Sequence, residues 1–354
     1  MKILSRHIAR HVIMGSLMAL AVLVAIDVVF AFSAEANDIG QGDYSFGKSL
    51  LYILLTAPRR AYDFLPMAAI TGSLVMLGAL ASSSEFVAMR SAGISIGQIA
   101  RSILKGGMVL VVLAILLSEA VIPFSEPYAQ QMRSFAQTQS TALKSTHGIW
   151  ARDGLSFVNI ASIRPDGELR KLDIYEFDEK YRLRLMTHAR SAVFDNDEWI
   201  LNGIEQTRIE KESIEIKAYD KANWNALLNP ELLSVLAVKP EQLPIWRLRT
   251  YIEYLELNEL ETEPYEFALW KKITGPFAIL VMLFLSVPFI FSALRSTGAG
   301  QRTLIGIVVG IVYLLISQVT IRMGAVYNFD PALSNFAPLL LFFAAGLFGL
   351  RLVR

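Results

Sequence analysis

Cysteine is absent from all 354 residues of this chain. This absence excludes a disulfide framework, a zinc or iron–sulfur site built on thiolates, and a thiol nucleophile. Charged residues are also scarce: they make up 18% of the chain, against about 25% in an average soluble protein. The net charge of +1 is no sign of a nucleic-acid partner, and we expect none, because the charges are segregated along the chain and form no single basic face.

Apolar residues make up 54% of the chain and gather into long runs. About 20 consecutive apolar residues suffice to cross the roughly 30 Å hydrocarbon core of a bilayer. A sixth run, Phe336–Leu350, is near the lower limit, but snorkelling side chains can extend its ends. We therefore expect a polytopic helical membrane protein with six spans, the other five being Val12–Phe32, Phe64–Ala81, Ile103–Pro123, Ile273–Leu294 and Thr303–Ile321.

The first run also has features of a secretory signal peptide. Lys2, Arg6 and Arg10 precede it, and Ala34-Glu35-Ala36 resembles a cleavage site. The apolar core of a signal peptide is about 7–15 residues long, whereas this run is nearer 20. We therefore expect a retained membrane anchor.

Basic residues near the ends of the runs predict the orientation, since cytoplasmic loops carry an excess of Lys and Arg. The short loops on one side offer only Lys48, Arg59, Arg60 and Arg322. The other side carries Lys2, Arg6, Arg10, Arg90, Arg101, Lys105, Arg295, Arg302, Arg351 and Arg354. Both termini are therefore expected in the cytoplasm, and the long segment 124–268 outside it.

The outer segment has the pattern of antiparallel strands. Turn-like stretches such as Pro165-Asp166-Gly167 separate short runs that favour β structure. The alternation from Ser213 to Lys217 predicts a half-buried strand. We expect a sandwich or open barrel between two helical stretches, Ser125–Leu143 and Ile245–Glu261, with strands at Leu155–Ile163, Leu169–Phe177, Leu183–Phe194, Trp199–Ile209 and Ser213–Lys221.

The segment from Gly42 to Ser49 matches the nucleotide-binding pattern G-x-x-x-x-G-K-[ST]. That pattern binds phosphate only where a buried strand enters the loop and a helix leaves it. Here polar residues at the end of a membrane run precede the loop, on the side predicted to be outside. We therefore expect an ordinary loop with no role in ATP hydrolysis.

Ionisable residues within the runs are functional candidates, because each costs roughly 2.5–3.5 kcal/mol at the bilayer centre. Asp27 is expected either to pair with a neighbouring helix or to line a cavity, and Glu119 to be an interfacial acid or a functional group. Arginines at the outer rim either anchor lipid headgroups or bind phosphates in bidentate fashion; they are Arg59, Arg60, Arg133 and Arg322.

Two further patterns concern helix contacts. Gly306 and Gly310 form a GxxxG pattern that permits close helix packing. Between the second and third runs, three serines offer an N-cap, Glu85 suits the first turn of a helix, and Gly93 ends it. This short amphipathic helix either docks on a partner or lies on the membrane.

Several motifs resemble those of one known family. They are Leu65-Pro66-Met67-Ala68-Ala69, Leu77-Gly78, Glu85 and the run Met89–Ser95. They resemble the paired permeases of lipopolysaccharide export in Gram-negative bacteria, the LptF/LptG family. The block Gly148–Gly154 with Phe157, Trp270 and the block Phe289–Ser296 is similar to the LptG branch. The resemblance extends over nearly the whole chain.

This resemblance implies one half of an ABC transporter in the inner membrane. The other parts would be an LptF-type permease, a dimeric LptB-type ATPase that binds ATP and Mg, an LptC-type single-span protein and a periplasmic bridge. Lipopolysaccharide would leave the outer leaflet laterally, and this chain would carry no cofactor and catalyse no reaction. The implied units are residues 1–123, a periplasmic β-jellyroll at 124–268, and residues 269–354. A coupling helix at about 82–97 would contact the ATPase through Glu85, Phe86, Met89 and Arg90.

The chain departs from the family at the outer end of the first run. Relatives often have lysines there that can meet lipid A phosphates, whereas this chain has Glu35, Asn37 and Asp38. Arg133 matches a basic position of the family, and we expect Arg322 to compensate for the missing lysines. The candidate substrate-binding residues are Arg133, Arg322, Asp27, Phe30 and Arg59.

Two other classes of protein are alternatives to a lipopolysaccharide permease. Another ABC permease that handles lipids or lipoproteins is the alternative function, but the lipoprotein-sorting and macrolide types have four spans with the outer domain after the first. A membrane-embedded enzyme is disfavoured because the runs contain no Ser–Lys pair, acidic dyad or His/Asp/Glu metal set. His7 and His11 precede the first run, and His147 and His188 lie in the outer segment.

Overall fold

The computed structural model describes residues 2–138, 143–164, 167–178, 180–195, 198–209, 213–224, 239–291 and 298–353. Some predictions lie outside these residues. They are the turn residues Pro165 and Asp166, Glu179, and Asn196 and Asp197, the basic residues Arg295 and Arg354, and the end of the block Phe289–Ser296.

Six helical spans in the described residues are long and apolar enough to cross a membrane, which confirms the predicted number. Most continue beyond the apolar runs, because helical hydrogen bonding does not stop where the polar flanks begin. The third is a continuous rod with one π-helical turn, η1 (Leu117–Val121), between α4 and α5. The helices are α1 (Lys2–Glu35), α2 (Phe46–Ser82), α4 (Ile96–Leu116), α5 (Ile122–Thr138), α8 (Glu263–Phe291), α9 (Ala299–Tyr327) and α10 (Pro331–Val353).

Helix α2 is the centre of the bundle. In its most apolar stretch 78% of the residues are buried, against 17% in both α1 and α9. A Cβ added at Gly72 of α2 would lie 2.2 Å from the carbonyl oxygen of Gly15 in α1. On α9, a Cβ at Gly306 would lie 2.6 Å from Cα of Thr71, and one at Gly310 would lie 2.4 Å from the Met67 side chain. The GxxxG pattern therefore marks a close helix contact, as predicted.

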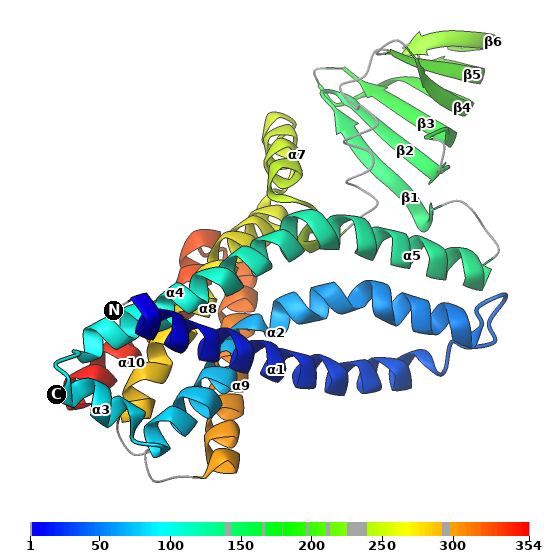
Figure 1. Ribbon diagram of the computed structural model, residues 1–354. Coiled ribbons are helices and arrows are strands. Elements are labelled where there is room, and N and C mark those ends of the chain that lie inside the picture. Colours follow the sequence, from blue (N-terminus) through cyan, green and yellow to red (C-terminus); the bar gives the residue numbers. More distant parts are fainter. Residues whose placement is uncertain are drawn as a thin grey trace.

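The two ends of the bundle differ. The chain termini and the short helix α3 (Glu85–Ser91) lie at one end, and the β sheet lies beyond the other (Figure 1). We call these the α3 end and the sheet end. Helices α1, α2 and α5 extend toward the sheet end (Figure 1).

The inserted domain is a six-stranded antiparallel sheet with the sequential order β1-β2-β3-β4-β5-β6. The fold class is therefore confirmed as a six-span helical membrane protein with an inserted antiparallel β domain. The strands described here lie in one sheet, whereas a jellyroll has two. They are β1 (Leu143–Asp153), β2 (Ser156–Ile163), β3 (Leu169–Phe177), β4 (Leu183–Asp195), β5 (Glu198–Ile209) and β6 (Ile214–Trp224).

Two details of the domain were predicted wrongly. Leu143 begins β1 and does not end a helix, since α5 stops at Thr138. The start of β1 is polar and lacks the alternation of apolar and polar residues that indicates a strand, so its sequence did not predict one. Strand β6 exists, but it is exposed along almost its whole length, with Ile214 69% and Ile216 63% exposed. It is the last strand of the described sheet, so its apolar residues have a described neighbouring strand on one side alone.

Helix α7 (Ile245–Leu257), preceded by the short 3₁₀ turn η2 (Pro240–Gln242), contacts the turn between β1 and β2. The Tyr254 hydroxyl donates to the carbonyl oxygen of Arg152 at 2.6 Å. The Gly154 amide donates to Oδ1 of Asn258 at 3.1 Å. Leu248, Ile252 and Leu255 form a buried apolar face of α7.

Candidate functional site

The predicted coupling helix forms α3, but its N-terminus differs from the prediction. Ser84 occupies the N-cap in a left-handed conformation, with φ 62°, and no serine side chain caps the helix. Ser83 donates instead to Oε1 of Glu85 at 3.3 Å. The expected end of the helix is present, because Gly93 has φ +86° and its amide bonds to the carbonyl oxygen of Arg90.

The two apolar candidates on α3 attach it to its own chain. Phe86 and Met89 are 3% and 7% exposed, and the Phe86 ring lies 5.3 Å from that of Phe291 at the end of α8. Arg90 is exposed, and Glu85 is half-buried. The side of α3 that carries Glu85 and Arg90 is therefore the one accessible to another protein.

Glu85 also connects α3 to α1. Its Oε2 atom lies 3.2 Å from Nε2 of His7. The rings of His7 and His11 are in turn 4.4 Å apart. The first helix and the predicted coupling helix are thus joined at the α3 end.

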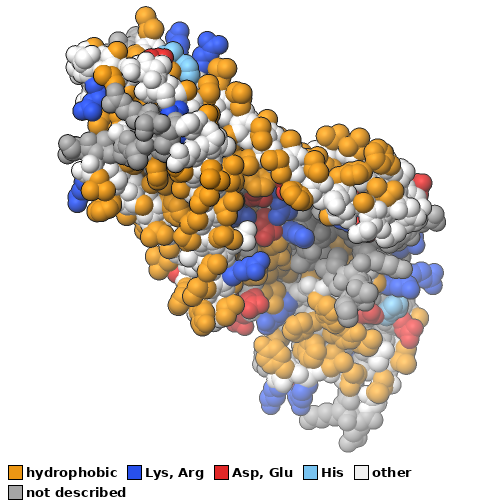
Figure 2. Space-filling model, turned by 90° about the horizontal axis from the view of Figure 1, so that it is seen from below, with side chains coloured by type: hydrophobic (Ala, Val, Ile, Leu, Met, Phe, Trp, Pro, Cys, Tyr) orange, Lys and Arg blue, Asp and Glu red, His pale blue; other side chains and the backbone are white. Residues whose placement is uncertain are grey.

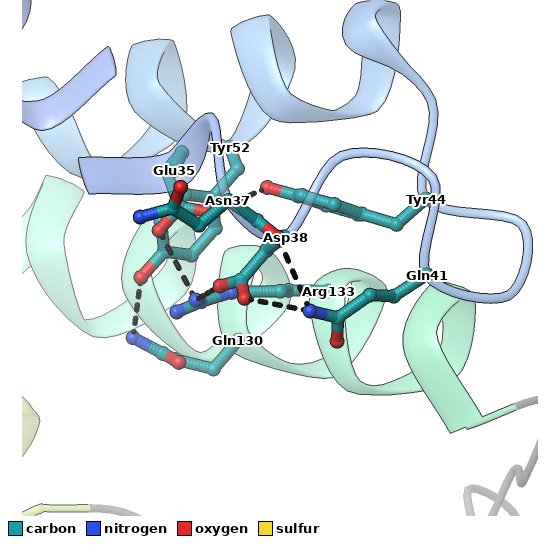
Figure 3. Close-up of polar contacts among 8 residues, drawn as sticks. All are labelled: Glu35, Asn37, Asp38, Gln41, Tyr44, Tyr52, Gln130 and Arg133. Atoms are coloured by element: carbon teal, nitrogen blue, oxygen red, sulfur yellow. Dashed lines mark hydrogen bonds and ion pairs between the residues drawn. The ribbon is translucent and has the colours of Figure 1, made fainter. Parts of the chain in front are cut away.

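At the sheet end, a polar cluster surrounds Arg133 of α5 (Figure 3). Its guanidinium pairs with Oε1 of Glu35 at 3.2 Å and with Asp38, and it lies over the Tyr52 ring, 5.0 Å from the centroid. Tyr44 donates to Oε2 of Glu35 at 2.9 Å. Burial and this hydrogen bond raise the pKa of Tyr44 to about 12, so the phenol remains a donor at neutral pH.

Glu35 and Asp38, the acidic residues found where relatives often have lysines, are thus the partners of Arg133. A guanidinium that pairs with two carboxylates has its charge neutralised. Arg133 consequently joins the loop between α1 and α2 to α5, and it presents no free charge to a phosphate. We call the set Glu35, Asp38, Tyr44 and Arg133 the Arg133 cluster.

Two other candidate residues also form ion pairs. Arg60 bonds to Asp27 at 2.5 Å, so Asp27 links α1 to α2. Arg59 bonds at 3.3 Å to Glu126, whose side chain is 6% exposed. Phe30 is 69% exposed on α1, away from the packed bundle.

Arg322 lies in a different environment. It lines a cavity of about 530 Å³ between α2, α8 and α9, where no described residue forms an ion pair with it. Lys271 and Asp63, 3.7 Å apart, lie beside the same cavity. The remaining wall mixes apolar side chains such as Phe64, Ile279 and Leu314 with polar ones that include Glu241 and Gln318. Charged side chains interrupt the hydrophobic surface where the helices meet the β domain (Figure 2).

The comparison with known proteins covers nearly the whole chain. The family model described as "Lipopolysaccharide export system permease LptF/LptG" matches residues 6–352. The chain belongs to the LptF/LptG family. It is 32% identical over 341 residues to the lipopolysaccharide export system permease protein LptG of Haemophilus influenzae, covering 96% of this chain and 95% of the relative. The LptG of Escherichia coli K12 is also 32% identical, over 348 residues, covering 98% and 97%.

Membership in the LptF/LptG family confirms the resemblance to its LptG branch and makes the chain a permease subunit of lipopolysaccharide export, located in the inner membrane. The family is one of transport subunits, which agrees with the expectation that this chain is not an enzyme. The alternative function, a lipoprotein permease, is not supported, because the LptF/LptG family model matches residues 6–352.

For a permease of this family, the structure separates the substrate candidates into two groups. Arg133, Arg59 and Asp27 are held in ion pairs, whereas Arg322 lines a cavity. Lys271, which lines the same cavity as Arg322, was not among the residues predicted from the sequence. Its position next to Trp270, where an apolar run begins, was the available signal.

The nucleotide-like segment has no phosphate-binding geometry. Helix α1 precedes the loop where a P-loop needs a buried strand. Lys48, in the first turn of α2, bonds to Asp43 of the preceding loop at 2.5 Å.

Proposed function

We propose that this permease extracts lipopolysaccharide laterally from the outer leaflet of the inner membrane and passes it toward a periplasmic bridge. An LptF-type permease, an LptC-type protein and a dimeric LptB-type ATPase that binds ATP and Mg complete the transporter. Both termini and α3 face the cytoplasm in this proposal, and the sheet faces the periplasm. The opposite ends of the bundle at which α3 and the sheet lie support this orientation.

Helix α3 is the contact with the ATPase. Phe86 and Met89 fix it in the bundle, so a force on its exposed face is transmitted to α8 through Phe291. The bond from Glu85 to His7 provides a second connection, to α1. Movement of the ATPase can in this way reach two membrane helices.

The cavity beside Arg322 is the place in this chain where a phosphate of lipopolysaccharide binds. Burying acyl chains is worth roughly 0.8 kcal/mol per CH₂, but the bilayer buries the same chains, so this contribution largely cancels on extraction. Phosphate contacts then decide whether the lipid enters. The observation that carries the proposal is the cavity, which combines a partly apolar wall with a cation that pairs with no described carboxylate.

Photocrosslinking tests this role of Arg322. A photoreactive residue at Gln318, which lines the same cavity, should label lipopolysaccharide in the assembled transporter. Arg322→Glu should lower the yield about tenfold, because a hydrogen bond to a charged group is worth about 1.5 kcal/mol. Arg184→Glu is the matched control, since Arg184 is an exposed arginine on β4. Equal labelling in the Arg322 and Arg184 variants would contradict the proposal.

A further inference from the structure

Lys272 is buried in α8, although it lies in a membrane-spanning segment. Its side chain is 6% exposed. The ammonium donates to the carbonyl oxygen of Ser118 at 2.9 Å, to its Oγ at 3.1 Å and to Oε1 of Glu119 at 3.2 Å. These bonds occupy all three donors of a lysine. A buried ammonium without such partners would carry a large desolvation penalty, so Lys272 ties α8 to this one place on its neighbour.

The acceptors lie in η1, the π-helical turn between α4 and α5. A π turn inserts one residue into an α-helix, and such turns often occur at functional sites. Ser118 also donates to Oε1 of Glu119 at 2.9 Å. The carboxylate is thereby held with its second oxygen available for another partner.

That second oxygen caps helix α7. Oε2 of Glu119 accepts the amide of Ile245, the first residue of α7, at 2.8 Å. The residue at the N-cap is Pro244, which has no side-chain acceptor, so α7 has no cap of its own. A carboxylate at a helix N-terminus satisfies a free N–H group and interacts favourably with the helix dipole.

The far end of α7 contacts the sheet. Tyr254 donates to the carbonyl oxygen of Arg152, and Asn258 accepts the amide of Gly154. A helix of 13 residues is about 20 Å long. A continuous series of bonds therefore runs from α8 through η1 and along α7 to the turn between β1 and β2, and α7 stands between the bundle and the sheet (Figure 1).

We propose that Glu119 and Lys272 are positioning residues that set the β domain over the membrane helices through α7. The proposal rests on the export function above, because a fixed sheet matters only if the lipid leaves the helices toward it. With the link broken, lipid still enters the cavity and ATP is still hydrolysed, but release outward falls. Glu119 serves two roles in this arrangement, as partner of Lys272 and as cap of α7.

Two double variants separate these roles. Glu119→Gln with Lys272→Met removes both charges, and the glutamine carbonyl can still accept the Ile245 amide. Glu119→Leu with Lys272→Met also leaves no unpaired buried charge, but it removes the cap. Replacing a buried ion pair by apolar residues is often neutral for stability, so both pairs of substitutions should permit assembly. They differ in the side-chain acceptor at position 119, which serves the Ile245 amide and the Ser118 hydroxyl.

Spin-label distances give the first measurement, and the absence of native cysteine makes labelling direct. Labels at Arg184, exposed on β4, and Leu333, 70% exposed on α10, report the position of the sheet in the assembled transporter. The Gln/Met variant should keep the native distance distribution, and the Leu/Met variant should broaden it. Asn258→Leu, which removes the bond from the Gly154 amide at the other end of α7, should also broaden it and serves as the test if Leu/Met fails to assemble.

The second measurement is lipopolysaccharide released from vesicles per ATP hydrolysed. The Leu/Met variant should lower this ratio about tenfold, since losing a hydrogen bond to a charged group shifts an equilibrium by that order. Its crosslinking at Gln318 should remain at the level of the unaltered permease, and the Gln/Met variant should keep a near-native ratio. A native distance distribution and release ratio in both the Leu/Met and Asn258→Leu variants would overturn the positioning role. Absence of lipopolysaccharide labelling in the unaltered permease would instead refute the export proposal. The spin-label distances would then still test whether Glu119 and Lys272 position the sheet.

Discussion

Replacing Arg133 by alanine should loosen the loop between α1 and α2 without weakening lipid capture at the cavity. The substitution leaves Glu35, whose side chain is 10% exposed, and Asp38 without their cation. It also removes the guanidinium from the face of the Tyr52 ring. Since the loop is held to α5 by this cluster, its open state should become more populated.

The size of the effect follows from the burial of the cluster. Breaking a fully buried ion pair costs about 3–5 kcal/mol, whereas an exposed pair contributes at most about 1 kcal/mol. Arg133 and Asp38 are each 27% exposed, so we take about 2 kcal/mol for the ion pairs. The contact with the ring adds about 0.5–1 kcal/mol. The sum predicts roughly a 50- to 150-fold larger open population.

Amide hydrogen exchange measures this opening. The amide of Asp43 bonds to the carbonyl oxygen of Ala136 in α5 at 2.7 Å, so its exchange reports whether the loop is attached. Exchange at Asp43 should accelerate by roughly 50- to 150-fold in Arg133→Ala. Lys48→Ala, in the first turn of α2, is the control, because the Lys48–Asp43 pair is more exposed, at 33% and 75%, and should change exchange less than about fivefold.

The opposite perturbation makes the reasoning refutable. Glu35→Gln combined with Asp38→Asn should free Arg133 and raise lipopolysaccharide crosslinking from a photoreactive residue at Gln130, whose amide contacts Tyr52 in the same cluster. If Arg133 binds phosphate in the unaltered permease, Arg133→Ala would instead lower that crosslinking and leave the exchange of the Asp43 amide unchanged. That pair of results would refute the structural role assigned to the arginine.

Three further outcomes are expected. Gly72→Leu should prevent α1 from packing on α2 and abolish recovery of folded protein, because overpacking of 1–3 kcal/mol or more is expected where two backbones touch; Gly47→Leu, in open space at the start of the same helix, should be recovered normally in size-exclusion chromatography. Lys48→Ala should leave ATP turnover of the assembled transporter unchanged, and a loss of nucleotide binding would contradict the orientation. Glu85→Lys should reduce copurification of the ATPase or transport while the chain still inserts, and transport equal to that of the unaltered permease at normal ATPase occupancy would argue against docking through α3.

Local patterns in the sequence were sufficient for most of the framework. The length of each apolar run decides whether a helix can cross a bilayer, and alternation over a few residues marks a strand. Both are properties of neighbouring residues, so the six spans and strands β2 to β6 could be predicted without a structure. The glycine spacing at Gly306 and Gly310 is equally local, and it marked a real helix contact.

The roles of the charged residues depended on the tertiary structure. Arg133 and Asp38 are 95 residues apart in sequence, and Lys272 and Glu119 are 153 apart, yet each pair is in contact. Whether a rim arginine is available to a phosphate depends on which carboxylate the packing brings beside it, and no periodicity encodes that distance. Amphipathic spacing likewise showed that the helix around Phe86 has an apolar face. Only the packing of α3 against α8 decided that this face is buried within the chain. The sequence thus determined which segments enter the membrane and which form the sheet, and the tertiary structure decided which cations remain available to bind a lipid.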